Sequence, residues 1–239
     1  MLKLIGNIKA TVRSGEVSRP EYKIINPSKD VSITYQDRDS VLIIEKRATN
    51  LSVSGNGNNI VIGTNTGVIG SGIQNGSRIF INGQEVTGQT QDTTLEVEVI
   101  LPKKDVCIHT SASAKAKLSL SEDVSYVELD AYSASSIKVG GSGVIQRLWL
   151  QASSASEIKF DSGLQILKVS SLVCHSASSI KIEGTVEECV SCECQSASNV
   201  KLEACNLIGQ VRAFSASGVK APGSKCGNVS KDFTSSYKN

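Results

Sequence analysis

The chain has 239 residues, and its 25 basic and 23 acidic side chains leave a formal net charge of +2 at pH 7. This balance does not require a polyanionic partner, and an aromatic content of 4% excludes a core built mainly from rings. The length is sufficient for a sizeable core in one or two domains. Seven cysteines, an odd number, favour a reducing compartment over a disulfide framework. Residues 1–10 contain no long apolar run, so the sequence predicts neither a signal peptide nor a membrane span.

The first 100 residues are rich in short segments with the composition of β-strands. These segments alternate apolar and polar residues or are β-branched, and they are separated by turn-prone stretches of Gly, Asn and Ser. Asn82-Gly83, between two such segments, predicts a hairpin. We interpret residues 1–100 as atypical coils, or as a sheet that covers one end of the regular region below. The predicted strands are 2–12, 32–35, 40–44, 59–62, 78–81 and 94–100.

The tripeptide Ser-Ala-Ser recurs six times in the second half of the chain, at intervals of 22, 21, 22, 20 and 19 residues. A fixed period near 20 residues is typical of a solenoid, in which each repeat buries its apolar face by stacking on its neighbours. We therefore expect residues 101–222 to form a single-stranded parallel β-helix of about six regular coils. Residues 223–239 are expected to be a polar tail that covers the other end or stays mobile. The copies begin at Ser111, Ser133, Ser154, Ser176, Ser196 and Ser215.

Aligning the copies on the first serine gives columns that predict which side chains face the core. Apolar positions two residues apart have the period of a strand with one buried face. The column two residues before the serine is small in five of six copies, and apolar columns follow four and six residues after it in the last five. The two columns before the serine are Cys107, Leu129, Leu150, Leu172, Cys192 and Val211, then His109, Ala131, Ala152, Cys174, Cys194 and Ala213.

The tripeptide itself has two interpretations. Strict alternation would point both serines inward and the alanine outward, whereas a corner at this place would reset the alternation. Small residues suit a tight corner between closely packed coils, and stacked hydroxyls can bond to one another or to the backbone. We favour the corner.

A lysine follows each of the last five tripeptides by five residues, and stacking of the coils would align these lysines on one outer face. The aligned ammonium groups could bind a linear polyanion such as an acidic polysaccharide or a nucleic acid. Alternatively, they keep the face soluble and alternate with acids such as Glu157, Glu183 and Glu203. Aromatic residues for base stacking are almost absent, which argues against single-stranded nucleic acid. The candidate ligand-binding residues are Lys138, Lys159, Lys181, Lys201 and Lys220.

Other clusters are better explained by the core than by chemistry. Cys192 and Cys194 share a strand face with core positions, and no second C-x-x-C accompanies Cys189-Val-Ser-Cys192. Cys174 and His175 are adjacent on a strand and would point to opposite faces. His109 falls in a small inward column, as a satisfied core residue or part of an irregular first coil.

The expected outward column of the first strands mixes charged, polar and apolar residues and forms no acid pair for glycan cleavage. Asp130, Glu193 and Arg212 share it with Gln151 and Val173. Phosphate-loop glycine spacing is also absent. We therefore expect no enzyme activity, no catalytic residues, no metal site and no cofactor.

Residues Thr94 to Pro102, followed by coils of the form apolar-x-small-x-Ser-Ala-Ser-x-Ile-Lys, resemble the auto-transporter adhesin head GIN domain family. The resemblance is best over residues 94–221, and Asp39 to Ile44 is similar to the family's early strand. It implies a right-handed β-helical adhesin on a bacterial surface. The chain differs in having Ser-Ala-Ser where the family shows corners like Gly-Ser-Gly, and in having no export signal. A cytoplasmic or phage-associated protein is therefore the alternative location.

These observations predict a non-catalytic, adhesin-like binding module that recognises a carbohydrate or another surface ligand. The expected partner is an acidic glycan or a cell-surface component, and nucleic acid is disfavoured. The alternative function is a self-associating scaffold built from stacked solenoids, which would make the protein a homo-oligomer.

Overall fold

The computed structural model describes residues 1–28, 30–36, 40–47 and 94–239 in full. Between them it also describes the backbone of β6 (Asn50–Gly55), β7 (Asn58–Gly63), β8 (Ile79–Ile81) and β9 (Gln84–Val86). Every regular element in these ranges is a strand. In the same ranges, no helix long and apolar enough to cross a membrane occurs.

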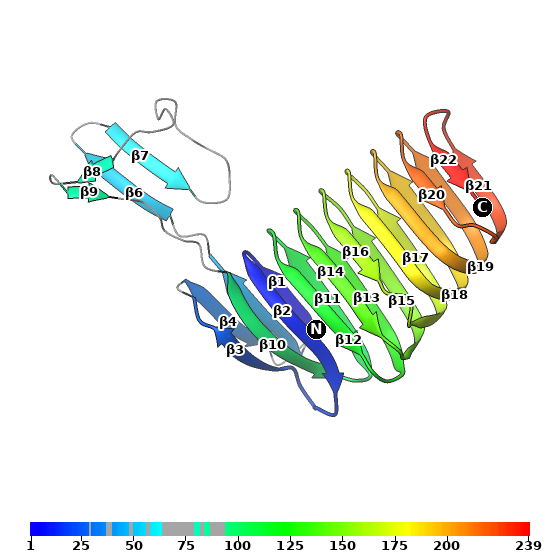
Figure 1. Cartoon of the computed structure of the whole chain (residues 1–239), viewed down its shortest axis with the longest axis horizontal. Helices are drawn as coiled ribbons and strands as arrows, with labels where there is room; N and C mark the ends of the chain where they lie inside the picture. Colours follow the sequence, from blue (N-terminus) through cyan, green and yellow to red (C-terminus); the bar gives the residue numbers. More distant parts are fainter. Residues whose placement is uncertain are drawn as a thin grey trace.

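Parallel coils stack along one axis and form a β-solenoid, which confirms the predicted fold class (Figure 1). Each regular coil contributes two strand segments, and each segment pairs in parallel with its equivalents one coil before and one coil after. The strands of this part are β11 (Asp105–Ser111), β12 (Lys115–Leu120), β13 (Val124–Ala131), β14 (Ser136–Gly141), β15 (Val144–Ala152), β16 (Glu157–Phe160), β17 (Gln165–Cys174), β18 (Ser179–Gln195), β19 (Asn199–Phe214) and β20 (Gly218–Lys220).

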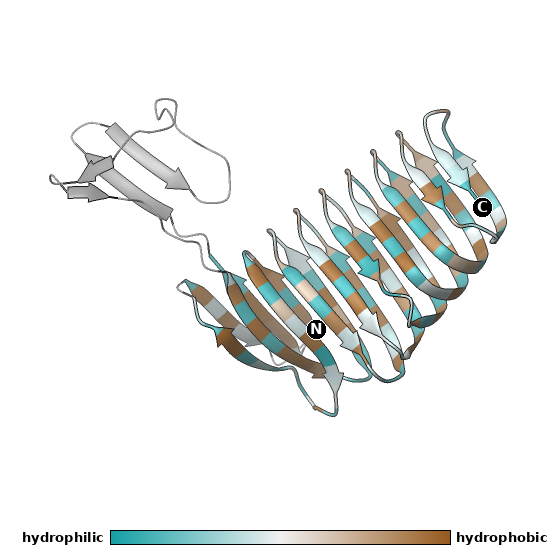
Figure 2. Ribbon diagram, viewed as in Figure 1, coloured by the Kyte–Doolittle hydropathy of each residue, from teal (hydrophilic) through white to brown (hydrophobic). Residues whose placement is uncertain are grey.

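The core runs through the middle of the stack because inward and outward residues alternate along each strand. In β12, for example, Ala116, Leu118 and Leu120 are buried and the residues between them are exposed. The alternation appears along the strands in Figure 2. Equivalent apolar residues lie directly over one another, as Leu129, Leu150 and Leu172 do. Such columns let each coil remove its apolar surface from water only by contact with the next coil.

The N-terminal coil lies inside the stack, and the N-terminus is seen there in Figure 1. This coil is formed by β1 (Leu2–Ile5) and β2 (Ile8–Gly15). β1 pairs with β5 (Val41–Lys46) on one side and with β11 on the other, and β2 lies likewise between β10 (Leu95–Pro102) and β12. The coil of β1 and β2 is thus first in the sequence but second in the stack. The outer coil, formed by β5 and β10, comes later in the sequence, and β11 then continues the stack on the other side of the N-terminal coil.

Two antiparallel strands continue the sheets beyond this outer coil. β3 (Glu21–Asn26) pairs with β10, and β4 (Val31–Gln36) pairs with β5. β4 was predicted from the sequence, whereas β3 was not, because its six residues show no alternation of apolar and polar side chains. In the structure all six residues of β3 are exposed. β8 and β9 pair as the predicted hairpin requires, and its turn, Asn82-Gly83, lies outside the described residues.

Each of the last five Ser-Ala-Ser segments is a corner, as we favoured. Its first serine and its alanine have left-handed backbone, with φ of 58° and 60° at Ser154 and Ala155. The second serine is buried in all five. In four of them, Ser135, Ser156, Ser198 and Ser217, its hydroxyl donates a hydrogen bond to a carbonyl one coil back, as from Ser156 Oγ to Ala131 O at 2.6 Å. Small side chains are needed at the left-handed positions because bulk is poorly tolerated there.

The first copy is shifted by one residue relative to the alignment on its letters. Its left-handed residues are Ala112 and Ser113, and Ala114 takes the buried place of the second serine. Ile108 therefore pairs with Leu129, and Cys107 and His109 face outward. The prediction that these two residues occupy inward columns was wrong, while the irregular first coil that we considered for His109 is what the structure contains.

The stretch 223–239 continues the stack. It forms β21 (Lys225–Lys231), which pairs with β19, and β22 (Ser236–Lys238), which pairs with β20, both in parallel. β1, β2, β5 and β10 likewise contribute coils at the other end, in addition to the antiparallel strands β3 and β4. The residues described in full thus form one continuous solenoid, while β6 to β9 form two separate two-stranded sheets. The division at residues 101 and 222 separates regular from less regular coils.

The corners give a test of their backbone conformation. Replacing Ala155 with Gly is expected to stabilise the protein by about 0.5–1 kcal/mol, because Gly adopts positive φ without the cost that Ala bears. Replacing Ala152, a buried strand residue of the same coil, with Gly should destabilise it instead. Urea unfolding of the two variants measures both effects. A loss of stability in Ala155→Gly would contradict the left-handed corner.

Candidate functional site

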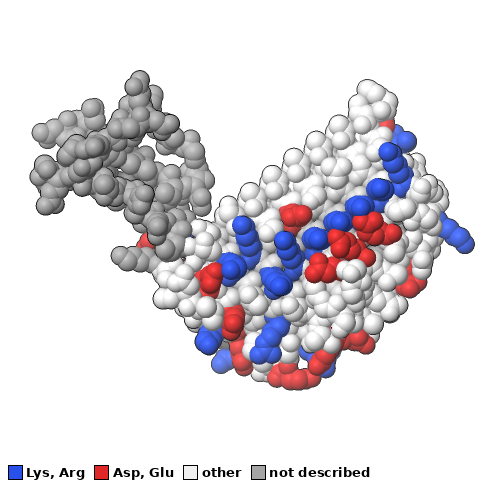
Figure 3. Space-filling view, viewed as in Figure 1, with Lys and Arg blue, Asp and Glu red and all other residues white. Residues whose placement is uncertain are grey.

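The predicted lysine column exists and is longer than the sequence indicated. Strand pairing places seven lysines in successive coils in register on one outer face, where Figure 3 shows a line of basic side chains. The five predicted lysines are all included. Lys117 was missed because the first copy is shifted by one residue, and Lys238 because the tail was not expected to form a coil. We call this set the lysine stripe: Lys117, Lys138, Lys159, Lys181, Lys201, Lys220 and Lys238.

Two glutamates neutralise the middle of the lysine stripe. Glu183 Oε1 lies 3.2 Å from Lys159 Nζ and 2.7 Å from Lys181 Nζ, and Glu203 forms ion pairs with Lys181 and Lys201. The bonds from Lys181 and Lys159 lower the pKa of Glu183, and the bond from Lys201 lowers that of Glu203. The bond to Glu183 raises the pKa of Lys181. Because these side chains are only partly buried and remain in contact with solvent, the network orders them more than it stabilises the fold.

Four lysines of the stripe form no ion pair with the described residues: Lys117 and Lys138 toward one end, and Lys220 and Lys238 toward the other. Strand stacking spaces neighbouring lysines by about 4.8 Å, where two ammonium groups in water repel by about 0.9 kcal/mol. Both ends of the stripe therefore retain positive charge that an anionic ligand can neutralise. The face combines the two interpretations drawn from the sequence, with a solvated ion-pair network in the middle and free cations on either side.

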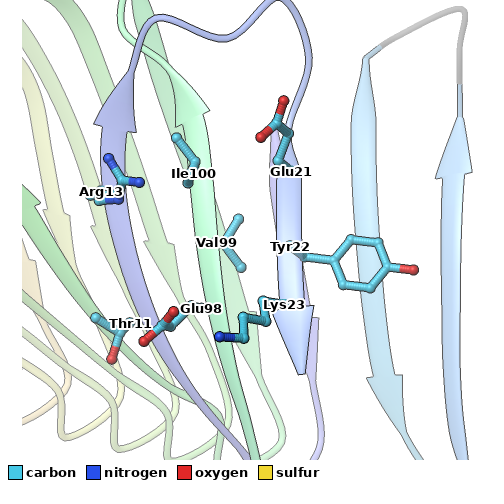
Figure 4. A pocket seen from close by; sticks show the side chains of 8 residues that line it. All are labelled: Thr11, Arg13, Glu21, Tyr22, Lys23, Glu98, Val99 and Ile100. Carbon is cyan, nitrogen blue, oxygen red and sulfur yellow. The ribbon is translucent and has the colours of Figure 1, made fainter. Parts of the chain in front are cut away.

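The lysine stripe leads to a pocket at the outer coil. Lys117 pairs with Thr11, Thr11 with Glu98, and Glu98 with Lys23 of β3. These residues, except Lys117, line a cavity of about 420 Å³ together with Arg13 and the others shown in Figure 4. β10 lies between β2 and β3 in this pocket although it is about 70 residues or more from both in the sequence, so no local sequence pattern could have predicted the pocket.

A second group of polar residues lies on the outward side of the first strands and was also missed. His109 Nε2 is 3.4 Å from Glu128 Oε1, and His109 Nδ1 is 3.8 Å from Asp130 Oδ2. Asp130 is 7% exposed, and its Oδ1 has no hydrogen-bond partner. Burial, and to a lesser extent Glu128, raise the pKa of Asp130 to about 6, while His109 opposes the shift. The outward column of Asp130, Gln151, Val173, Glu193 and Arg212 is confirmed.

The raised pKa of Asp130 predicts a stability that falls as the pH rises. The folded protein keeps this proton up to about pH 6, whereas the unfolded chain releases it near pH 4, so ionisation costs stability between these values and the full penalty holds above pH 6. Asp130→Asn is expected to raise the free energy of unfolding by about 1–2 kcal/mol at pH 8 and to change it little at pH 3. Urea unfolding at both pH values checks this. A gain of equal size at both would contradict it.

The cysteine clusters belong to the core, as the sequence suggested. Cys189, Cys192 and Cys194 are at most 1% exposed, and burial raises the pKa of Cys189 to about 12. Cys174 is buried while its neighbour His175 faces outward. In the described part of the chain, His, Cys, Asp and Glu form no group of three or more that could hold a metal ion.

Comparison with known proteins adds little to this geometry. No family model matches the chain, so the resemblance to the head GIN domain family receives no support from that search. No curated protein matches it either. Among solved structures, a candidate cell adhesion protein from Clostridium sporogenes is similar over 97% of this chain and 92% of its own, with 10% sequence identity and a TM-score of 0.29.

Proposed function

We propose that the protein is a non-catalytic, adhesin-like binding module that holds a linear acidic polysaccharide along the lysine stripe. The observation that carries the proposal is the register of the seven lysines, one per coil, on a single face. A stack of hydrogen-bonded coils is rigid, so the cations are already in line before a ligand arrives and binding costs little ordering entropy.

The ligand class follows from the shape and composition of this face. A straight row of like charges fits an extended chain with regularly spaced acidic groups better than a compact anion. The stripe consists of lysines alone and contains no aromatic ring on which a base could stack. This composition disfavours single-stranded nucleic acid as the ligand. Glu183 and Glu203 already pair with the middle lysines. A ligand that binds there must displace these carboxylates from the lysines or form hydrogen bonds to the ion-pair network.

A glycan array tests the proposal with matched ligands and variants. Wild type is expected to bind polygalacturonate and to bind its fully methyl-esterified form weakly, because esterification removes the negative charges. Lys117→Gln, Lys138→Gln and Lys220→Gln combined should lower polygalacturonate binding at least tenfold, whereas Lys225→Gln, an exposed lysine outside the stripe, should not. Equal binding by wild type and the triple variant would refute the stripe as the site.

Self-association is a second candidate, favoured by the coil of β21 and β22. Val229 is 45% exposed there and Phe233 is fully exposed, although both are apolar. Apolar side chains beside a strand edge are suited to pairing with another chain. Light scattering over a range of concentrations tests this: an increase in mass that Phe233→Ser abolishes would support the scaffold function, and a constant monomer mass would exclude it.

A further inference from the structure

We infer that the pocket formed by β2, β10 and β3 binds the terminal sugar of the acidic polysaccharide, a pyranose unit that carries one carboxylate. The inference rests on the proposed function, because it places the end of the polymer where the lysine stripe ends. It adds a second, separate site with its own specificity: the stripe recognises charge along the polymer, and the pocket recognises a single acidic sugar.

The pocket consists of two short rows of side chains across three neighbouring strands. One row contains Arg13, Ile100 and Glu21, and the other contains Thr11, Glu98 and Lys23. Figure 4 shows the rows side by side, with the ring of Tyr22 pointing away from them. A cavity of about 420 Å³ lies among these side chains, a volume in the range of small-molecule sites.

The four charged side chains of the pocket, Arg13, Glu21, Lys23 and Glu98, form no ion pair with any described residue. This contrasts with the middle of the stripe, where opposite charges on neighbouring strands do pair. The donors of Arg13 and Lys23 and the acceptors of Glu21 and Glu98 are therefore available to a ligand. All four side chains belong to exposed residues, so a ligand can reach them without opening the core.

This combination of groups selects the chemistry of the ligand. Arg13 offers a planar pair of donors that matches a carboxylate. Glu21 and Glu98 accept hydrogen bonds from hydroxyl groups and oppose a ligand with several negative charges, such as a phosphate or sulfate cluster. Ile100 provides an apolar surface for the C–H face of a ring, and Thr11 can donate or accept. A sugar acid with one carboxylate and several hydroxyls satisfies all of these groups.

The position of the pocket relative to the stripe explains why the terminal unit is the one that binds. Thr11 occupies the place in the lysine column directly before Lys117, and Glu98 and Lys23 follow it outward. A chain lying along Lys138 and Lys117 therefore reaches Thr11 next. Beyond it the column changes from cations only to the mixed charges of the pocket, so the repulsion from Glu98 limits how far a polyanion can continue.

Two ligands and two sets of variants test the inference. Binding of monomeric galacturonate and of galactose is measured by NMR titration of the full chain, and binding of polygalacturonate by calorimetry. Galacturonate is expected to bind at least about tenfold more tightly than galactose, and Arg13→Gln should remove this difference. Arg212→Gln, an exposed arginine on another face, is the matched control and should leave it unchanged. The triple variant of Lys117, Lys138 and Lys220 should bind the monosaccharide as wild type does.

The outcomes separate this inference from the proposed function. If wild type does not bind galacturonate, or if Arg13→Gln binds it unchanged, the pocket assignment is overturned, and the stripe is still judged by the polymer alone. If the triple variant binds polygalacturonate as tightly as wild type, the stripe is overturned, while a loss of galacturonate in Arg13→Gln still supports the pocket. Thermal unfolding of each variant identifies any that fail to fold, and Arg13→Lys then replaces Arg13→Gln, because Lys keeps the charge and loses the planar donor pair.

Discussion

Phe160→Ala is expected to lower the free energy of unfolding by about 3–5 kcal/mol. Phe160 is completely buried and has the largest fully buried side chain in the described part of the chain. It lies in the inward column between Val139 and Ile182 of the neighbouring coils. The backbone hydrogen bonds between coils fix the strand spacing, so the surrounding side chains can fill only part of the cavity. Urea unfolding followed by circular dichroism measures the change.

Phe233 provides the matched control, since it is the same residue type and is fully exposed. Phe233→Ala should change the free energy of unfolding by less than about 0.5 kcal/mol. If the two variants are destabilised equally, or if Phe160→Ala costs less than about 1 kcal/mol, the coils do not enclose a packed core at this level. The comparison therefore tests the interior of the solenoid independently of its surface.

Gly141→Ala is expected to cost about 3 kcal/mol or more, although Gly141 is exposed to solvent. Its φ is +131°, a region that is essentially restricted to glycine. A Cβ atom at this position would also lie 1.8 Å from the carbonyl oxygen of Leu120 in the coil below. That oxygen accepts a hydrogen bond from Ser142 N, so it cannot move away without losing the bond. Surface exposure alone would predict a neutral substitution.

Gly223 separates the two causes of this cost. Its φ is +76°, but a Cβ there would meet no atom within 4 Å. Gly223→Ala should therefore cost only the conformational penalty of about 1–2 kcal/mol. Chemical unfolding of both variants gives the difference, which contains the steric contribution at Gly141 together with the larger conformational cost of its φ of +131°. Equal losses in the two variants would show that the adjacent coil does not approach Gly141 closely.

Much of the fold could be predicted because the repeated copies can be aligned with one another within the single sequence. Leu129, Leu150 and Leu172 recur at nearly constant spacing, and alternation identifies them as inward without any knowledge of the partner strand. The corner could be inferred for a similar reason, since only small residues occupy it. The first copy misled the alignment because Ser111-Ala112-Ser113 has the letters of the corner while the turn begins one residue later.

The arrangement of the first 100 residues could not be predicted because it depends on contacts between distant segments. Nothing local in residues 2–5 indicates that they lie between residues 41–46 and 105–111. The same limit applies to the pocket, whose Arg13, Lys23 and Glu98 come together only through that arrangement. The stripe, in contrast, could be predicted from local sequence, because one lysine recurs at the same position of each repeat.

The ion-pair network required the structure as well. The sequence indicated that glutamates alternate with the lysines, but not which lysines they neutralise. Glu183 and Glu203 pair with the middle lysines, and Lys138 and Lys220 on either side remain without ion pairs among the described residues. The lysines predicted as one uniform set thus differ in their readiness to bind an anion, and the unpaired ones are the better targets for substitution.

The salt dependence of polygalacturonate binding to the wild-type chain tests the central claim most directly. If the lysines lie in one line and neutralise the polymer together, the logarithm of the association constant should fall linearly with the logarithm of the salt concentration, because counterions released from the polymer on binding drive the association. Calorimetric titration between low and physiological salt gives this slope. An affinity that does not change with salt would contradict the account.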